Sequence, residues 1–86
     1  MKLKKDFIIY NTREESMLVP SGRALFSGLV KGNETFGVIL KHLSEEISEQ
    51  DLIQTMCEEY DAPSEKIAED VRKAITILRD IGALDE

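Results

Sequence analysis

The sequence of 86 residues is poor in the residue types that build reactive sites. It has one histidine, His42, one cysteine, Cys57, and no tryptophan. A single cysteine excludes an intrachain disulfide and a cysteine-rich metal site, and one histidine beside it is a poor supply of the several convergent ligands that a metal site needs. We expect His42 at the surface near the end of a helix and Cys57 packed within another. Because neither has a serine or acidic partner at recognisable spacing, the sequence predicts no active site, no cofactor and no enzymatic activity.

Long apolar runs and basic residues are also scarce. No apolar segment approaches the roughly 20 residues that a membrane-spanning helix needs. The basic start, Met1–Asp6, is followed by only four apolar residues, too few for the core of a signal peptide. Lysine and arginine number 11 against 17 aspartates and glutamates, a net charge of −6, whereas a nucleic-acid binder needs a basic face. The sequence therefore predicts a cytoplasmic protein that binds neither a membrane nor nucleic acid.

The remaining composition is that of a folded domain. Hydrophobic residues make up 42% of the chain and charged residues 33%, a balance typical of globular proteins rather than disordered ones. No repeat or linker interrupts the chain, so we expect one domain over residues 1–86. Such a short chain can build a binding surface but has little room for a deep catalytic cavity.

The first third of the chain predicts an antiparallel β-meander. Phe7–Tyr10 and Met17–Val19 are apolar runs of strand length, separated by a polar segment of hairpin-loop length. Pro20 should end the second strand because proline cannot donate to a sheet. A third strand is expected from about Ala24 to Lys31, with Gly28 inside it, where a glycine permits close approach of another backbone.

Helical spacing begins at Asn33, a favourable N-cap residue. Ser48 starts a segment that resembles a capping box, Pro63 suits the first turn of a third helix, and Gly82 suits the position just after its end. Three apolar stripes follow these signals: Phe36, Ile39, Leu40 and Leu43; Leu52, Ile53, Met56 and Tyr60; Ile67, Val71, Ile75 and Leu78. Residues 83 and 84 should fold back onto the core. The order of elements predicts an α+β, winged-helix-like domain of three strands followed by three helices.

Charge is unevenly distributed along the predicted helices. Residues 44–70 hold ten acidic side chains and one basic side chain, a local balance of −9. This pattern is typical of a solvated helix face that keeps a domain soluble. The third helix instead groups Arg72, Lys73 and Arg79, which are either ordinary surface charges or a small anchor for acidic groups on a partner.

Several segments of the chain resemble the PqqD-like family. The run Phe26–Thr35 resembles the family's strand-to-helix segment. Three later segments also match the family pattern: the end of the first predicted helix at Ile39–Leu43, the segment Glu69–Val71 at the entry to the last helix, and the closing run Leu78–Leu84. Each motif is short, and their order and spacing over nearly the whole chain carry the resemblance.

The sequence departs from the family pattern at three positions. Leu40 stands where the family often has tryptophan, Gly32 where leucine is common, and Ala74 where a larger apolar residue is usual. These departures bear on the shape of a ligand groove more than on the fold.

The resemblance implies peptide binding without catalysis. PqqD-like domains are recognition elements for ribosomally made peptides that are modified after translation. They bind the leader of a precursor peptide and present its core to a modifying enzyme, often a radical S-adenosylmethionine enzyme. In the family the leader adds as a strand to the third strand and rests against the third helix. An edge strand is compatible with this mode, since its unpaired N–H and C=O groups can accept another chain.

Candidate peptide-binding residues follow from this placement and from strand alternation, which assigns Phe26 and Val30 to the core side. They are Leu25, Ser27, Gly28, Leu29, Val30 and Lys31 on the strand, and Asp70, Lys73, Ala74, Ile77 and Ile81 on the helix. Ile77 and Ile81 lie off the apolar stripe of the third helix. They belong either to a wide core face or to the floor of a peptide groove, in which the small Ala74 leaves room.

Two further interpretations stay open at this point. The same fold could serve as the DNA-binding domain of a winged-helix transcriptional regulator, because fold does not fix function. Against it, acidic and basic residues on the third helix balance: Glu65, Glu69, Asp70 and Asp80 against Lys66, Arg72, Lys73 and Arg79. The second is a structural or interaction subunit with an unrelated partner. An exposed edge strand would also allow a homodimer. The sequence identifies neither the precursor peptide nor the partner enzyme.

Overall fold

A computed structural model describes residues 1–13, 15–20 and 30–86 of the chain. The strands are β1 (Lys2–Leu3), β2 (Phe7–Asn11), β3 (Ser16–Pro20), β4 (Val30–Gly32) and β5 (Leu84–Asp85). The helices are α1 (Glu34–His42), α2 (Glu49–Glu59) and α3 (Ser64–Asp80). The predicted α+β class and the order of three strands followed by three helices are confirmed. Among the described residues, no helix is both long enough and apolar enough to cross a membrane.

The three-stranded sheet is the predicted meander, with strand order β2-β3-β4 and antiparallel pairing throughout. Pro20 is the last residue of β3, as expected from its missing N–H group. Of the predicted third strand, Val30 and Lys31 lie in β4, which continues to Gly32. Residues 24–29 of that prediction lie outside the described residues. In this sheet β4 is an edge strand.

The predicted helix boundaries rest on capping interactions that the structure contains. The Asn33 side chain accepts a hydrogen bond from the Phe36 N–H at 3.0 Å, and the Ser48 hydroxyl accepts one from the Asp51 N–H at 3.1 Å. Both interactions satisfy a backbone donor that the first turn of a helix leaves unpaired. The predicted starts of α1 and α2 are therefore confirmed.

The end of α3 turns the chain back onto the core. Gly82 has φ +72°, a left-handed conformation that favours glycine, and the Ala83 N–H donates to the Leu78 carbonyl at 2.8 Å. This Schellman-type ending places Ala83 and Leu84 in the core, as predicted. Leu84 then pairs with Leu3 in the small β1–β5 sheet, which was not predicted from the sequence.

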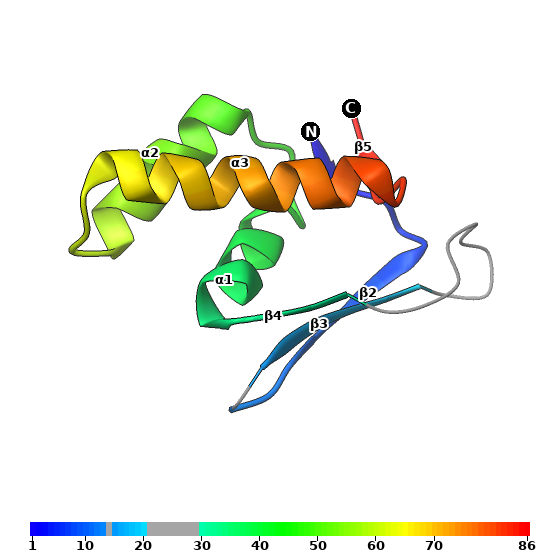
Figure 1. Cartoon of the computed structure of the whole chain (residues 1–86). Coiled ribbons are helices and arrows are strands. Elements are labelled where there is room, and N and C mark those ends of the chain that lie inside the picture. The colour runs from blue at the N-terminus through cyan, green and yellow to red at the C-terminus, as the bar shows by residue number, and fades with distance from the viewer. Residues whose placement is uncertain (14, 21–29) are drawn as a thin grey trace.

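Helix α1 occupies the centre of the molecule. It contacts all three strands of the sheet and also α2 and α3 (Figure 1). All three helices lie on the same side of the three-stranded sheet (Figure 1). The fully buried side chains come from every layer and include Leu18, Leu40, Leu52, Met56, Val71, Ile75 and Leu78. The arrangement leaves α3 running above β4, with the first turns of α1 between them.

One close approach fixes how α1 sits on the sheet. Gly37 is buried in α1, and a Cβ atom there would overlap with the Ser16 hydroxyl and lie 2.9 Å from the Ser16 Cβ. The glycine that weakens the helical pattern in the sequence is therefore the residue that lets α1 reach β3.

Candidate functional site: a cleft between the edge strand and the last helix

A cavity of about 210 Å³ opens between β4 and α3. We call it the β4–α3 cleft. Strand β4 and its end contribute Val30, Lys31, Gly32 and Asn33; α1 contributes Thr35, Phe36 and Ile39; α3 contributes Asp70, Lys73, Ala74 and Ile77. The strand edge and the helix flank that were predicted to bind a peptide are thus brought together around one hollow.

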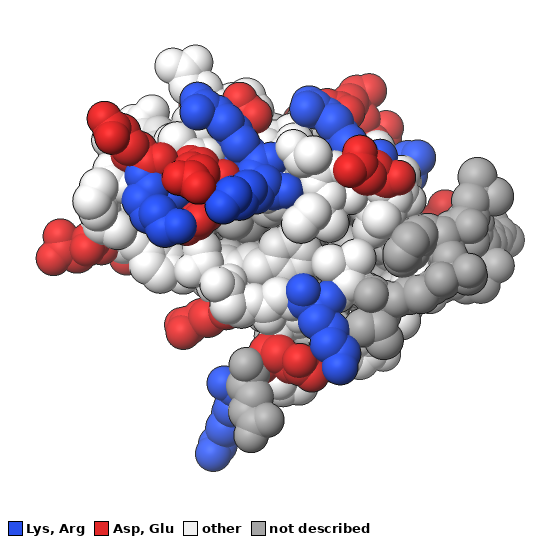
Figure 2. All heavy atoms as spheres, viewed as in Figure 1, with Lys and Arg blue, Asp and Glu red and all other residues white. Residues whose placement is uncertain are grey.

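The floor of the cleft is apolar. Phe36, Ile39 and Ala74 are buried core residues whose surfaces also line the cleft. Ile77, which also lines the cleft, is 44% exposed. Figure 2 shows uncharged residues in the band between the charged side chains over α3 and the strands below it. An apolar hollow of this kind favours apolar ligand side chains, because each one that enters leaves water.

The glycine at position 32 shapes the strand side of the cleft. A Cβ atom at Gly32 would overlap with Phe36, including the Cβ of that residue. The ring therefore packs directly over the strand backbone and becomes part of the cleft wall. Leucine, which is common in the family at this position, would require Phe36 to move.

Charged residues form the rim of the cleft. Lys73 Nζ lies 3.0 Å from the Glu69 carboxylate, and Asp70 Oδ1 lies 3.1 Å from Lys66 Nζ, each pair spanning one turn of α3. The carboxylate of Glu69 raises the pKa of Lys73, and Lys73 in turn lowers the pKa of Glu69. These pairs are exposed and hold little free energy, so the rim can rearrange around a ligand at small cost.

On the strand side, Lys31 Nζ lies 3.8 Å from the carboxylate of Glu15, which does not line the cleft. Among the described residues, no buried side-chain nitrogen or oxygen lacks a hydrogen-bond partner. The described part of the cleft therefore contains no buried, unpaired side-chain nitrogen or oxygen that would need a hydrogen bond from the ligand. A ligand would meet the apolar floor, the backbone groups of β4 and the charged rim.

The remaining candidate residues have separate outcomes. Ile81 is half-buried and packs against the core, outside the residues that line the cleft. Leu25, Ser27, Gly28 and Leu29, together with the predicted core residue Phe26, lie outside the described residues. Their predicted roles stay predictions.

The contribution of α1 to the cleft was not predicted from the sequence. Phe36 and Ile39 were assigned to the core only, and Asn33 only to the helix cap. Because α1 begins two residues after β4 ends, its first turns must lie beside the strand, and that short connection is the signal that could have revealed them.

The scarce reactive residues lie elsewhere. His42 Nε2 contacts the Glu59 carboxylate and so joins the ends of α1 and α2, and Cys57 packs half-buried against the core. Neither lines the cleft. Within residues 1–13, 15–20 and 30–86, no group of three histidine, cysteine or acidic side chains could hold a metal ion.

Comparison with known proteins gives one family and two similar structures. The family model described as "Coenzyme PQQ synthesis protein D (PqqD)" matches residues 11–84. One similar structure is TbiB1 in complex with the TbiA(beta) leader peptide, with a TM-score of 0.77 and 16% identity over 99% of this chain and 95% of that one. Another is lasso peptide synthetase B1 complexed with the leader peptide, with a TM-score of 0.71 and 20% identity over 95% of this chain and 93% of that one. No curated protein matches. At these identities the two structures establish a shared fold.

Proposed function

We propose that this chain, which belongs to the PqqD family, is a non-catalytic peptide chaperone that binds the leader of a ribosomally synthesised precursor peptide. The observation that carries the proposal is the apolar β4–α3 cleft beside an edge strand. Two proteins that share the fold over nearly the whole chain are each described in complex with a leader peptide, which supports the same class of ligand here.

The leader binds by strand addition to β4. An edge strand presents unpaired backbone donors and acceptors, and a peptide backbone satisfies them whatever its side chains are. Alternate side chains of the added strand then point toward α3. There they meet Ala74 and Ile77 and the ring of Phe36, which would select apolar leader residues.

The bound leader presents the rest of the precursor to a modifying enzyme. In this family the enzyme is often a radical S-adenosylmethionine enzyme, and we propose that class as the partner. The chain itself contributes affinity and position, so its removal should slow the enzyme's reaction by raising the precursor concentration that the reaction needs.

The alternative of a DNA-binding regulator finds no support in the charge arrangement of α3. Lys66 and Lys73 each pair with a carboxylate on the same helix, at Asp70 and Glu69. A phosphate would have to compete with those carboxylates, and the net charge of −6 opposes its approach.

Titration calorimetry tests the proposal. The ligand is the leader segment of a short precursor peptide encoded near this gene, and the control is the same peptide with its sequence scrambled. We expect submicromolar to low-micromolar affinity for the leader, with the negative heat-capacity change that burial of apolar surface produces. Equal affinity for the scrambled peptide, or no binding of any encoded leader, would refute the proposed function.

A further inference from the structure

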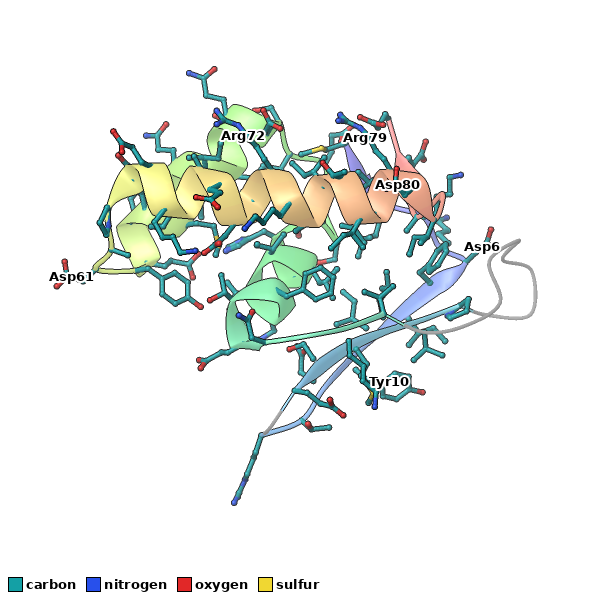
Figure 3. The ribbon with its side chains drawn as sticks, in the orientation of Figure 1. Asp6, Tyr10, Asp61, Arg72, Arg79 and Asp80 are labelled. Carbon is teal, nitrogen blue, oxygen red and sulfur yellow. The ribbon has the colours of Figure 1, made fainter. Side chains whose placement is uncertain are left out.

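Ala74 occupies the middle of the α3 wall of the β4–α3 cleft. It is only 3% exposed and yet lines the cavity, with Asp70 one turn before it on the helix and Ile77 about one turn after it. Figure 3 shows Arg72 and Arg79 on the side of α3 that is turned away from the three-stranded sheet. The wall that α3 presents to the cleft therefore has its smallest side chain at its centre.

A second small residue, Gly32, lies on the strand wall, and the space beside it is filled. A Cβ atom at Gly32 would overlap with the ring and the Cβ of Phe36. Beside Ala74, by contrast, the cavity of about 210 Å³ is open among the described residues. Because Ala74 otherwise belongs to the packed core, the cleft is the space into which a longer side chain at position 74 would extend. That space is available to a ligand.

The volume of the cavity is enough for a large apolar side chain. A cavity of about 150 Å³ lined by leucine, isoleucine and phenylalanine binds benzene. The cleft is larger, at about 210 Å³, and Phe36, Ile39 and Ala74 form its apolar floor. The exposed side chain of Ile77 would cover one flank of an inserted group. A side chain as large as an aromatic ring would therefore fit and would leave water on several sides at once.

Strand geometry limits how many leader residues can use this space. Residues of an added strand point alternately to the two sides of the sheet. A volume of about 210 Å³ is that of a cube about 6 Å on each side, whereas successive residues on one side of a strand are about 7 Å apart. The hollow therefore takes the side chain of one leader residue at a time.

We propose that the leader inserts one large apolar side chain, up to the size of an aromatic ring, over Ala74, and that Ala74 is the residue that sets the size of this anchor. The proposal rests on the leader-binding function. A leader side chain shorter than the hollow leaves part of its lining without contacts. A longer side chain at position 74 takes the place of the anchor. Leader residues that point away from the cleft do not meet Ala74 and tolerate replacement.

Reciprocal changes of size on the domain and on the peptide test this pairing. The probe is the leader segment of the precursor peptide encoded near this gene, with each large apolar residue replaced by alanine in turn, and titration calorimetry measures its binding. For the wild-type domain, alanine at one leader position should weaken binding at least about tenfold, the scale of a lost interface anchor. Ala74→Leu should weaken binding of the unchanged leader by a similar factor. It should bind the leader with alanine at that position more tightly than the unchanged leader, which reverses the wild-type order.

Ala68 provides the matched control. It is an alanine of the same helix, and it lines a separate surface pocket with Ile53 of α2, outside the cleft. Ala68→Leu should leave the affinity for every leader variant within about twofold of the wild type. Leucine ranks close to alanine in helix propensity, so neither substitution weakens α3 itself. Circular dichroism first shows that each variant is folded, and the smaller change Ala74→Val, with the same reversal expected, replaces Ala74→Leu if that variant unfolds.

Each contrary outcome has a distinct meaning. If a folded Ala74 variant binds the unchanged leader within about twofold of the wild type, or weakens all leader variants by the same factor, Ala74 does not set the anchor and the leader-binding function stands. A leader scan against the wild-type domain in which no large apolar residue matters by more than about twofold would also overturn the proposal, without any variant of the domain. A wild-type domain that binds no leader would remove both proposals.

Discussion

Replacing Ile77 by alanine isolates the apolar contribution of the cleft. Ile77 is 44% exposed in the free domain, and a peptide seated in the cleft would cover that surface. Because full burial of an isoleucine side chain contributes about 1.5–3 kcal/mol, covering the exposed 44% contributes about 0.7–1.3 kcal/mol. Alanine loses most of that contribution, so Ile77→Ala should raise the dissociation constant of the leader about three- to ninefold. Titration calorimetry resolves a change of this size.

Ile8 provides a matched control for this measurement. It is the same residue type, it is 46% exposed, and it lies on β2, opposite Val19 of β3 and outside the residues that line the cleft. Ile8→Ala should therefore leave leader affinity within about twofold of the wild type. Equal losses of leader affinity in the two variants would show that a general change in the domain, and not the cleft, governs binding, and the reasoning would then fail.

Three further predictions concern stability and selectivity. Gly37→Ala should lower the free energy of unfolding, measured in urea, by about 1–3 kcal/mol, because the new Cβ overlaps with Ser16 in a packed interface. A gain in helix propensity of about 1 kcal/mol offsets only part of this loss. An unchanged urea midpoint would contradict the close approach of α1 to β3. The free energy of unfolding should fall with acidification, because Lys73 lowers the pKa of Glu69 and Arg79 lowers the pKa of Glu86. The stabilisation from these two carboxylates is present above their ordinary pKa of 4.5 and is lost as the pH falls below it. Urea midpoints that do not differ between about pH 6 and about pH 3 would contradict this assignment. DNA should bind weakly and without sequence preference, and a gel-shift assay that shows nanomolar, selective binding at physiological salt would favour the regulator instead.

The elements with local signals could be predicted from the sequence. Asn33 and Ser48 cap their helices where predicted, and Gly82 ends α3 in the left-handed conformation. The core stripe of α3, from Ile67 to Leu78, is buried as expected. In each case the cause lies within a few residues of the chain, so the pattern is visible without the fold.

Features that depend on distant contacts could not be predicted. The β1–β5 pair joins Leu3 to Leu84, and no local pattern links two strands of two residues. Gly37 weakens the helical signal, and its reason, the closeness of Ser16, exists only in the packed structure. Sequence patterns report propensity, whereas these contacts arise from how the elements pack.

The candidate site falls between these cases. Its two sides, at Lys31 and at Lys73–Ile77, were predicted from the family resemblance and meet in the cleft. Its floor was not predicted, because Phe36 and Ile39 were counted only as core residues. A residue can close the core and line a cleft at once, and one-dimensional periodicity cannot distinguish these two roles.

The claim that a leader adds as a strand between β4 and α3 is tested most directly by an amide-shift titration of the isotope-labelled domain with its leader peptide. We predict that the perturbed amides concentrate in Leu25–Lys31 and in Lys73–Ile81, and that the amide protons of β4 exchange more slowly with solvent when the peptide is bound. Perturbations centred on α2, at Glu49–Glu59, with unchanged exchange in β4, would contradict the account.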